Sequence, residues 1–326
     1  MCTAIRMTTA DTYVGRNLDL EYSYREELVH TPRHFPLIFR RLPALETHYA
    51  VLGTAYVPDD FPLYYDAVNE YGLFMAGLNF PQYAQYEAGG DEAVAPFEVI
   101  PFVLAQCCTV NEACDLLRHT PIAAVDYSEK LPCTPLHWML ADHETCVAVE
   151  PTAQGLLLTP NPTNVLTNSP PLSYHLTTLA QYTSLTPHTP PDTFGKTAVP
   201  LYSRGMGTEG LPGGYSSTAR FVRAAYGREH SRCEEGEEQS VMQMFHLLGS
   251  VAHPRGSVIM PDGREEITVY SSCCNLRTGA YYYKTYNSSH LCAVDFEMDN
   301  RDGECLYRYP MEDVFNLYFP CPFSTA

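Results

Sequence analysis

Basic residues are scarce in this chain, and their scarcity excludes two classes of partner. The 326 residues hold 20 Lys and Arg against 38 Asp and Glu, which gives a net charge of −18. A field of this sign repels nucleic acid and anionic membrane surfaces, so we expect neither as a partner. An anionic ligand has to be attracted by a local cluster of arginine, because the overall charge repels it.

Long apolar runs are also missing. No stretch reaches the roughly 18 apolar residues that a membrane-spanning helix needs. The first residues do not form a cationic segment followed by an apolar run, so we expect no signal peptide. We therefore expect a cytoplasmic protein with reduced cysteines.

The cysteines lack the spacing of metal sites. Although the chain has 12 cysteines, no Cys-x-x-Cys occurs, and Cys107-Cys108 and Cys273-Cys274 are adjacent pairs. His143 and Cys146 lie at an expected hairpin turn and have no second ligand pair. We expect no metal and no cofactor, and interpret the cysteines as small buried apolar residues.

One cysteine stands apart because it is the second residue. Methionine is normally removed before a small residue, so the mature chain should begin at Cys2. A thiolate is a strong nucleophile, and an α-amine titrating at roughly 7.7–8.0 can act as its base. By position alone, the alternative is a frayed terminus without a role.

The pattern of apolar residues predicts strands, then helices, then strands, helices and strands again. This order favours an α+β fold in one domain, residues 1–326, with two sheets and helices packed outside them. Residues 183–215 are expected to form a loop excursion and 301–326 a C-terminal tail. The expected strands are Cys2–Met7, Tyr13–Leu18, 49–57, 72–79, a meander over Leu136–Asn168, 267–272, 280–286 and 291–296. The expected helices are Phe97–Gln106, one after the capping box Thr109-x-x-Glu112, and Glu237–Leu248.

Two charged residues in the second expected strand could serve Cys2. An arginine favours a thiolate, and a carboxylate can orient an α-amine. Strand alternation sends Arg16 and Asp19 to opposite faces, so both reach Cys2 only if the strand bends near Asn17. Without such a bend, an ordinary surface ion pair is the simpler interpretation.

Seven short runs stand out along the chain. They are Met1–Ala4, Gly15–Asp19, Ala76–Pro81, Leu136–Met139, Val165–Pro170, Ser216–Arg223 and Phe245–Leu248. In these runs and in their order, over residues 2 to about 297, the chain resembles the choloylglycine hydrolase family. The resemblance implies an N-terminal nucleophile hydrolase with an αββα four-layer sandwich, two antiparallel sheets between helix layers. The family comprises conjugated bile salt hydrolases and penicillin V acylases.

The resemblance also implies roles for particular residues. Cys2 would attack an amide carbonyl with its own amine moving the proton, and Asp19 would hold that amine. Arg16 and Arg220 would surround the sulfur and its charged partners. The Asn79 main-chain N–H and the Asn168 side-chain amide would form the oxyanion hole.

Asparagine at position 79 resembles the bile salt hydrolase branch, since penicillin V acylases tend to carry tyrosine there. The implied substrates are bile salts conjugated to glycine or taurine, and the implied assembly is a homotetramer or homodimer. A rigid steroid needs an apolar cleft with few polar anchors. The candidates for its lining are Leu18, Leu20, Tyr24, Leu131 and Leu136.

Residues 205–210 form a G-x-G-x-x-G that we do not interpret as a dinucleotide site. No apolar strand precedes it, and Pro212-Gly213-Gly214 prevents the helix that should follow. In the family, Ser-Arg-x at this place tends to accompany a preference for glycine conjugates. Arg204 could pair with a glycine carboxylate.

Three alternatives stay open at this point. The same nucleophile could act on penicillin V or another N-acyl amide or lactone. The acyl-enzyme could be taken by an amino acid instead of water, which would make the protein a bile acid N-acyltransferase. The protein could also bind bile acids without catalysis.

Overall fold

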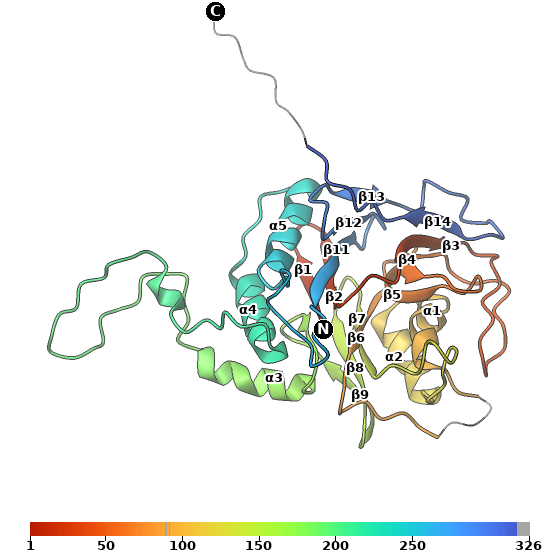
Figure 1. The fold of residues 1–326 in the computed structure, drawn as a ribbon, viewed down its shortest axis with the longest axis horizontal. Coiled ribbons are helices and arrows are strands. Elements are labelled where there is room, and N and C mark those ends of the chain that lie inside the picture. Colours follow the sequence, from red (N-terminus) through yellow and green to blue (C-terminus); the bar gives the residue numbers. More distant parts are fainter. Residues whose placement is uncertain (89, 91, 318–326) are drawn as a thin grey trace, which may run out of the picture.

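Two antiparallel sheets lie face to face at the centre of the molecule, with helices on their outer faces (Figure 1). The computed structural model describes residues 1–88, 90 and 92–317. The layers are helices, a six-stranded sheet, an eight-stranded sheet and helices, which confirms the expected αββα sandwich.

The six-stranded sheet contains the N-terminus of the chain. Its strand order is β10-β1-β2-β11-β12-β13, and every neighbouring pair is antiparallel. Its strands are β1 (Cys2–Thr8), β2 (Thr12–Leu20), β10 (Val165–Leu166), β11 (Ile267–Asn275), β12 (Tyr281–Thr285) and β13 (Cys292–Val294).

The eight-stranded sheet contains most of the middle of the chain. Its order is β14-β3-β4-β5-β6-β7-β8-β9, also antiparallel throughout. Its strands are β3 (Glu27–Thr31), β4 (Val51–Tyr56), β5 (Leu63–Asn69), β6 (Phe74–Asn79), β7 (Leu136–Ala141), β8 (Cys146–Thr152), β9 (Gly155–Pro160) and β14 (Tyr307–Pro310).

Each sheet has its own helices. α4 (Ser217–His230) and α5 (Glu237–Gly249) pack on the six-stranded sheet, and α3 (Leu172–Thr178) lies beside α4. α1 (Val99–Leu104) packs on β5 and β6, with α2 (Val110–His119) beside it. Within the described part of the chain, no helix has the length and apolar character needed to cross a membrane. The 3-10 turns are η1 (Pro96–Glu98), η2 (Leu179–Tyr182) and η3 (Met206–Thr208).

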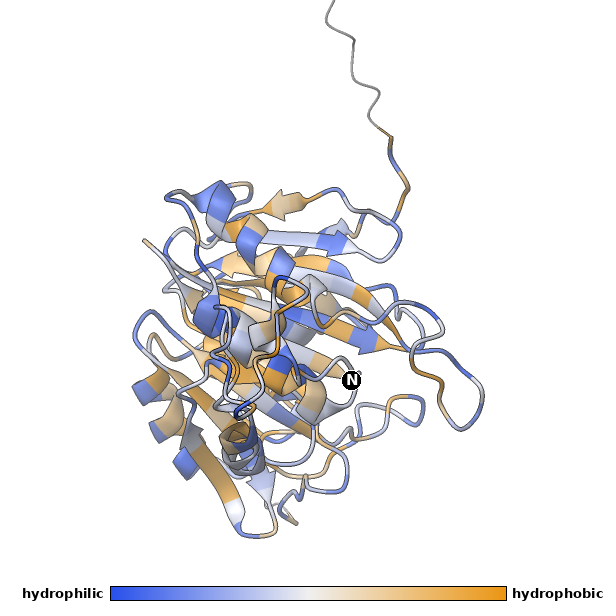
Figure 2. Ribbon diagram, turned by 90° about the vertical axis from the view of Figure 1, so that its left-hand side faces the viewer, coloured by the Kyte–Doolittle hydropathy of each residue, from blue (hydrophilic) through white to orange (hydrophobic). Residues whose placement is uncertain are grey.

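The main core lies where the two sheets face each other. Ala4 and Leu18 of one sheet belong to the same buried cluster as Ala76, Leu78 and Met139 of the other. Figure 2 shows the hydrophobic colour concentrated in strands and helices and the surrounding loops mostly hydrophilic. Burying these apolar faces is the main stabilising contribution to the sandwich. It also places the start of β1 in the interior.

Several expected elements are confirmed, and some of their boundaries differ. The hairpin β1–β2, the meander β7 to β10 and the helix α5 are present. α2 begins after Thr109, whose side chain accepts a hydrogen bond from the Glu112 N–H at 3.2 Å. The expected helix Phe97–Gln106 is shorter, because its first turn is the 3-10 turn η1. The strands β3 and β5 were not predicted.

The expected C-terminal tail needs a correction. Part of the segment 301–326 belongs to the fold, because Tyr307–Pro310 forms β14 and pairs with β3. This pairing covers an edge that β3 would otherwise expose. Residues 318–326 of the expected tail lie outside the described residues.

The segment 183–215 is a long loop that projects away from the sheets (Figure 1). The Thr186 N–H donates to the Gly207 carbonyl at 2.9 Å, which closes the base of the loop. A Cβ on Gly207 would lie 2.4 Å from the Thr186 oxygen, so only glycine fits this approach. No strand precedes the G-x-G-x-x-G, and only the 3-10 turn η3 lies within it, as expected.

Candidate active site

Cys2 is the first residue of β1 and lies between the sheets. It pairs with Leu18 of β2, and its side chain is buried. The structure contains Met1, so the nitrogen of Cys2 is a peptide N–H, which donates to the Asn168 Oδ1 at 2.8 Å. Because this hydrogen bond and the strand pairing hold Cys2 in place, Cys2 is not part of a frayed terminus.

Arg16 is the residue that contacts the sulfur. Its Nη2 lies 2.8 Å from the Cys2 Sγ, and its Nη1 donates to the Tyr65 carbonyl at 2.9 Å. The guanidinium is fully buried. Burial by itself lowers the pKa of Arg16, but the acidic groups around it, Cys2 first, raise that pKa above its usual value. Arg16 therefore stays charged beside the thiol, which favours the thiolate.

Asp19 lies next to the N-terminus without a bend in β2. The strand is continuous from Thr12 to Leu20, so the bend expected near Asn17 is absent. The irregularity lies in the neighbouring β11, where the register shifts between Thr268 and Tyr270. Asp19 borders the main chain of Met1, since its N–H donates to the Met1 carbonyl at 2.9 Å.

The Met1 ammonium occupies a polar site beside Asp19. It donates to the Asp19 carbonyl and to the Glu266 Oε1, each at 2.6 Å. The Asp19 Oδ1 accepts from the Thr268 hydroxyl at 2.6 Å, while its Oδ2 is buried without a partner and lies 3.9 Å from the His253 Nε2. Burial raises the pKa of Glu266, but His253 and the Met1 ammonium outweigh this effect and lower it. These acceptors are suited to an ammonium.

Asn79 and Asn168 lie against each other near Cys2. The Asn168 Nδ2 donates to the Asn79 carbonyl at 2.8 Å, which uses one of its two hydrogens. The Phe80 N–H donates to the Pro135 carbonyl at 2.8 Å, so these two residues form a hydrogen-bonded pair between β6 and β7. Hydrogen-bonded and non-bonded pairs alternate along an antiparallel ladder, which makes the neighbouring pair, Asn79 and Leu136, a non-bonded one. The main-chain N–H of Asn79 therefore points away from β7, on the same side as its carbonyl and Asn168.

Arg220 lies beside Cys2 and Asn168. It does not contact the sulfur but holds main chain and side chain around it. Its Nη1 donates to the Cys2 carbonyl at 2.5 Å and to the Thr3 hydroxyl at 2.6 Å. Its Nη2 donates to the Asn168 Oδ1 at 2.6 Å. Burial lowers the pKa of Arg220, although the nearby Asp19 and Cys2 favour its charge. Arg220 thus fixes Cys2 relative to Asn168.

Replacing Arg220 with methionine should destabilise this arrangement. The change keeps the length of the side chain but leaves buried acceptors at Cys2 and Asn168 with fewer partners, so we expect the free energy of unfolding to fall by about 3 kcal/mol. Urea denaturation measures this quantity. Arg223→Met is the matched control, because Arg223 lies one turn along α4 and donates to the loop carbonyls of Pro212 and Gly214. A loss no larger than the control's would contradict the assignment.

Cys2 lies on the wall of a largely apolar cavity of about 360 Å³. Asn79 lies on its wall, as do all five apolar residues expected there from the sequence. The cavity also takes in aromatic residues that were not predicted. The predicted members are Leu18, Leu20, Tyr24, Leu131 and Leu136, and the unpredicted aromatic ones include Tyr22, Tyr56, Tyr65, Phe97 and Tyr127.

Arg204 is not brought to this cavity. It is exposed on the excursion and is not among the residues that line the space around Cys2 in the described part of the chain. The expected pairing with a substrate carboxylate therefore has no support within this one chain. Arg204 was predicted from the Ser-Arg-x run alone, and such a run does not determine where a long loop lies relative to the cavity.

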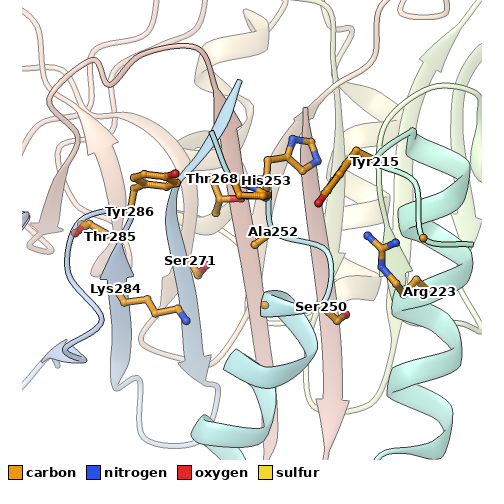
Figure 3. Close-up of a pocket in the computed structure, with 13 residues that line it drawn as sticks. Tyr215, Arg223, Ser250, Ala252, His253, Thr268, Ser271, Lys284, Thr285 and Tyr286 are labelled. Atoms are coloured by element: carbon orange, nitrogen blue, oxygen red, sulfur yellow. The ribbon is translucent and has the colours of Figure 1, made fainter. Parts of the chain in front are cut away.

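A second cavity, of about 540 Å³, is lined by residues of α4, β11 and β12 and of the segment that follows α5 (Figure 3). Thr268, which donates to Asp19, and His253 lie on its wall, together with the cationic side chains of Arg223 and Lys284. None of the predicted site residues lines it. Cys2 is not among the described residues that line it.

Two histidines that sequence reasoning missed hold the segment that carries Asn168. A ring nitrogen of His175 lies 2.9 Å from the Asn168 carbonyl, and one of His137 lies 2.8 Å from the Thr167 carbonyl. Glu150 accepts from the Leu172 N–H at 3.0 Å. The sequence offered one signal, His137 within a recognised motif, but none that related these three residues to Asn168.

Comparisons with known proteins agree with this geometry. The model of the choloylglycine hydrolase family of linear amide C–N hydrolases matches residues 2–308. A bile salt hydrolase/transferase from Lactiplantibacillus plantarum is 42% identical over 98% of this chain and 99% of its own. A bile salt hydrolase/transferase from Clostridium perfringens is 34% identical over 97% of this chain and 99% of its own.

Solved structures have the same fold. A conjugated bile acid hydrolase from Clostridium perfringens superposes with a TM-score of 0.91 at 32% identity, over 98% of this chain and 99% of that one. A penicillin V acylase from Agrobacterium tumefaciens has a TM-score of 0.77 at 18% identity, over 97% of this chain and 94% of that one, and shows the fold alone. The chain belongs to the choloylglycine hydrolase family and is an enzyme that cleaves linear amide C–N bonds.

Proposed function

We propose that this enzyme hydrolyses the amide bond of bile salts conjugated to glycine or taurine, with Cys2 as the nucleophile once Met1 is removed. The observation that carries the proposal is the Cys2 sulfur, 2.8 Å from Arg16, at the wall of an apolar cavity of about 360 Å³. Such a cavity suits a rigid steroid body. The names of the similar bacterial enzymes support the same substrate class.

The proposed reaction has two steps. The free α-amine of Cys2 takes the thiol proton, and the thiolate attacks the amide carbonyl. The oxyanion is held by the Asn79 N–H and by the second hydrogen of the Asn168 Nδ2. The amine then passes its proton to the departing glycine or taurine nitrogen, which leaves a thioester. Water, deprotonated by the same amine, releases the bile acid and restores the thiol.

Intact-protein mass spectrometry tests the proposal directly. We expect the isolated protein to lack Met1 and to gain the mass of one cholyl group, located on Cys2, when glycocholate is added and the mixture is quenched. Free cholate should accumulate at the same time. An unmodified Cys2 during turnover would contradict the mechanism.

A panel of substrates distinguishes the finer proposals. We expect glycocholate to be cleaved with a higher kcat/KM than taurocholate, and both above penicillin V and N-acyl homoserine lactones. Because Arg204 is exposed on the excursion and does not line the cavity, we expect Arg204→Ala to keep the ratio of the two kcat/KM values, as should Arg41→Ala, also an exposed arginine. Equal kcat/KM values for glycocholate and taurocholate would contradict the glycine preference but not the proposed hydrolysis.

A second activity has a specific observation in its favour. Two of the similar enzymes are named hydrolase/transferase, and a thioester on Cys2 can be attacked by an amine as well as by water. We propose that an amino acid can accept the bile acid.

We also propose that the protein is a cytoplasmic homotetramer or homodimer. Light scattering coupled to size-exclusion chromatography distinguishes these two assemblies.

A further inference from the structure

Asp66 on β5 is a buried carboxylate that the proposed mechanism does not use. Its side chain is fully buried, yet three hydroxyl groups surround it. The Tyr270 hydroxyl donates to its Oδ1 and the Tyr281 hydroxyl to its Oδ2, each at 2.5 Å. The Ser272 hydroxyl donates to its Oδ2 at 3.1 Å. Donors from β11 and β12 of one sheet thus converge on a carboxylate of the other.

The nearest positive charge to this carboxylate is Arg16. The Arg16 Nη1 lies 3.9 Å from the Asp66 Oδ1, and the same nitrogen donates to the carbonyl of the preceding residue, Tyr65, at 2.9 Å. The Arg16 Nη2 lies 2.8 Å from the Cys2 sulfur. One guanidinium therefore bridges the nucleophile and Asp66, and all three side chains are buried.

The charges of Cys2, Arg16 and Asp66 depend on one another. A buried guanidinium without a counter-ion is costly, and Asp66 supplies that counter-ion while Cys2 is a neutral thiol. When the thiolate forms, Arg16 is attracted by two negative groups. The hydroxyl donors favour the ionised form of Asp66, whereas burial raises the pKa of Asp66. The titratable and charged groups that face Arg16 and Asp66 are Cys2, Tyr65, Tyr270, Cys274 and Tyr281.

We propose that Asp66, held by Tyr270, Tyr281 and Ser272, is a positioning residue that places Arg16 against Cys2 and limits how strongly Arg16 favours the thiolate. The inference rests on the proposed function, because it takes Cys2 as the nucleophile. It predicts two opposite effects of removing the charge of Asp66. The thiolate forms more readily, because Arg16 is no longer neutralised, but the sulfur is less well placed for attack.

The test is Asp66→Asn in protein free of Met1, with two measurements. The first is the rate at which iodoacetamide alkylates Cys2, followed by peptide mass spectrometry across pH. We expect the midpoint of this profile to fall by about 1 pH unit, because a negative charge near the Arg16–Cys2 pair is removed. The second is kcat on glycocholate, which should fall about tenfold through misplacement of the nucleophile, with KM within twofold. A midpoint that is unchanged or higher overturns the proposal.

Tyr281→Phe keeps the test valid if Asp66→Asn folds poorly. It removes one of the hydroxyl donors that favour the ionised form of Asp66, so Asp66 carries less negative charge and the midpoint should fall by a smaller amount in the same direction. Tyr283→Phe is the matched control, since Tyr283 lies two residues along β12 and its hydroxyl accepts from the Glu312 N–H at 3.1 Å. Equal midpoints for Tyr281→Phe and Tyr283→Phe overturn the proposal.

Failure of the proposed function would look different. Wild-type protein without Met1 would then fail to hydrolyse either conjugate, while the alkylation of Cys2 would remain measurable. The shift of its midpoint in Asp66→Asn tests the coupling through Arg16 independently of any substrate.

Discussion

Protein with Cys2 replaced by alanine is expected to lose hydrolysis of glycocholate almost completely, by about 10⁶-fold, as when other hydrolases lose their nucleophile. The reason is local. The Cys2 sulfur contacts the Arg16 guanidinium, and Cys2 lies on the wall of the apolar cavity. Alanine keeps Met1 removal and the α-amine but leaves nothing to form the thioester. Release of cholate, measured by chromatography, checks the expectation.

Two further variants make this result specific. Cys2→Ser replaces the thiol with a hydroxyl, a much poorer nucleophile at neutral pH, so it should show little hydrolysis. Cys146→Ala is the control: burial raises the pKa of that thiol to about 12, and β8 holds it away from the Cys2 cavity. Cys146→Ala should retain activity within about twofold. Appreciable hydrolysis by Cys2→Ala would exclude Cys2 as the nucleophile.

Protein that retains Met1 is expected to be nearly inactive although it is correctly folded. With Met1 in place the Cys2 nitrogen is a peptide N–H bonded to Asn168, so no amine is available to take the thiol proton. General-base catalysis contributes typically 10²–10⁴-fold, and we expect a loss of at least about that size. Expression with a methionine aminopeptidase inhibitor supplies the protein, and intact mass confirms its terminus.

Restoring activity is the critical control for Met1. Treatment with methionine aminopeptidase in vitro should remove 1 residue and raise glycocholate hydrolysis to the level of normally processed protein. The Met1 ammonium is held by Glu266 and by the Asp19 carbonyl, so removal should be slower than for a free peptide. Full activity of the Met1 form would contradict the role of the α-amine.

The sequence predicted the fold to the extent that local patterns determine it. Alternating apolar residues identified β1, β2 and the meander, and the Thr109 cap identified the start of α2. β3, β5 and β14 were missed. β14 pairs with a strand more than 270 residues earlier, so no local pattern relates the two.

The same division holds for the site. Proximity to Cys2 in a hairpin was enough to predict Arg16, since strand pairing is a short-range property. Asp66, Tyr270 and Tyr281 come from three strands in two sheets, and nothing in the sequence relates them to Arg16. Arg204 shows the converse, because a plausible sequence position did not bring the side chain to the cavity.

The sequence by itself led to the proposal that Cys2 is the nucleophile and needs a free terminus, and it predicted five apolar residues that line the cavity beside Cys2, because these inferences depend on residue type and on order along the chain. Only the tertiary structure decided what surrounds Cys2. Arg220 holds the main chain of Cys2 and not its sulfur, and Arg16 shares its charge with Asp66. Such contacts arise only when two sheets pack face to face and exclude water, since buried charges must then find their partners across the interface.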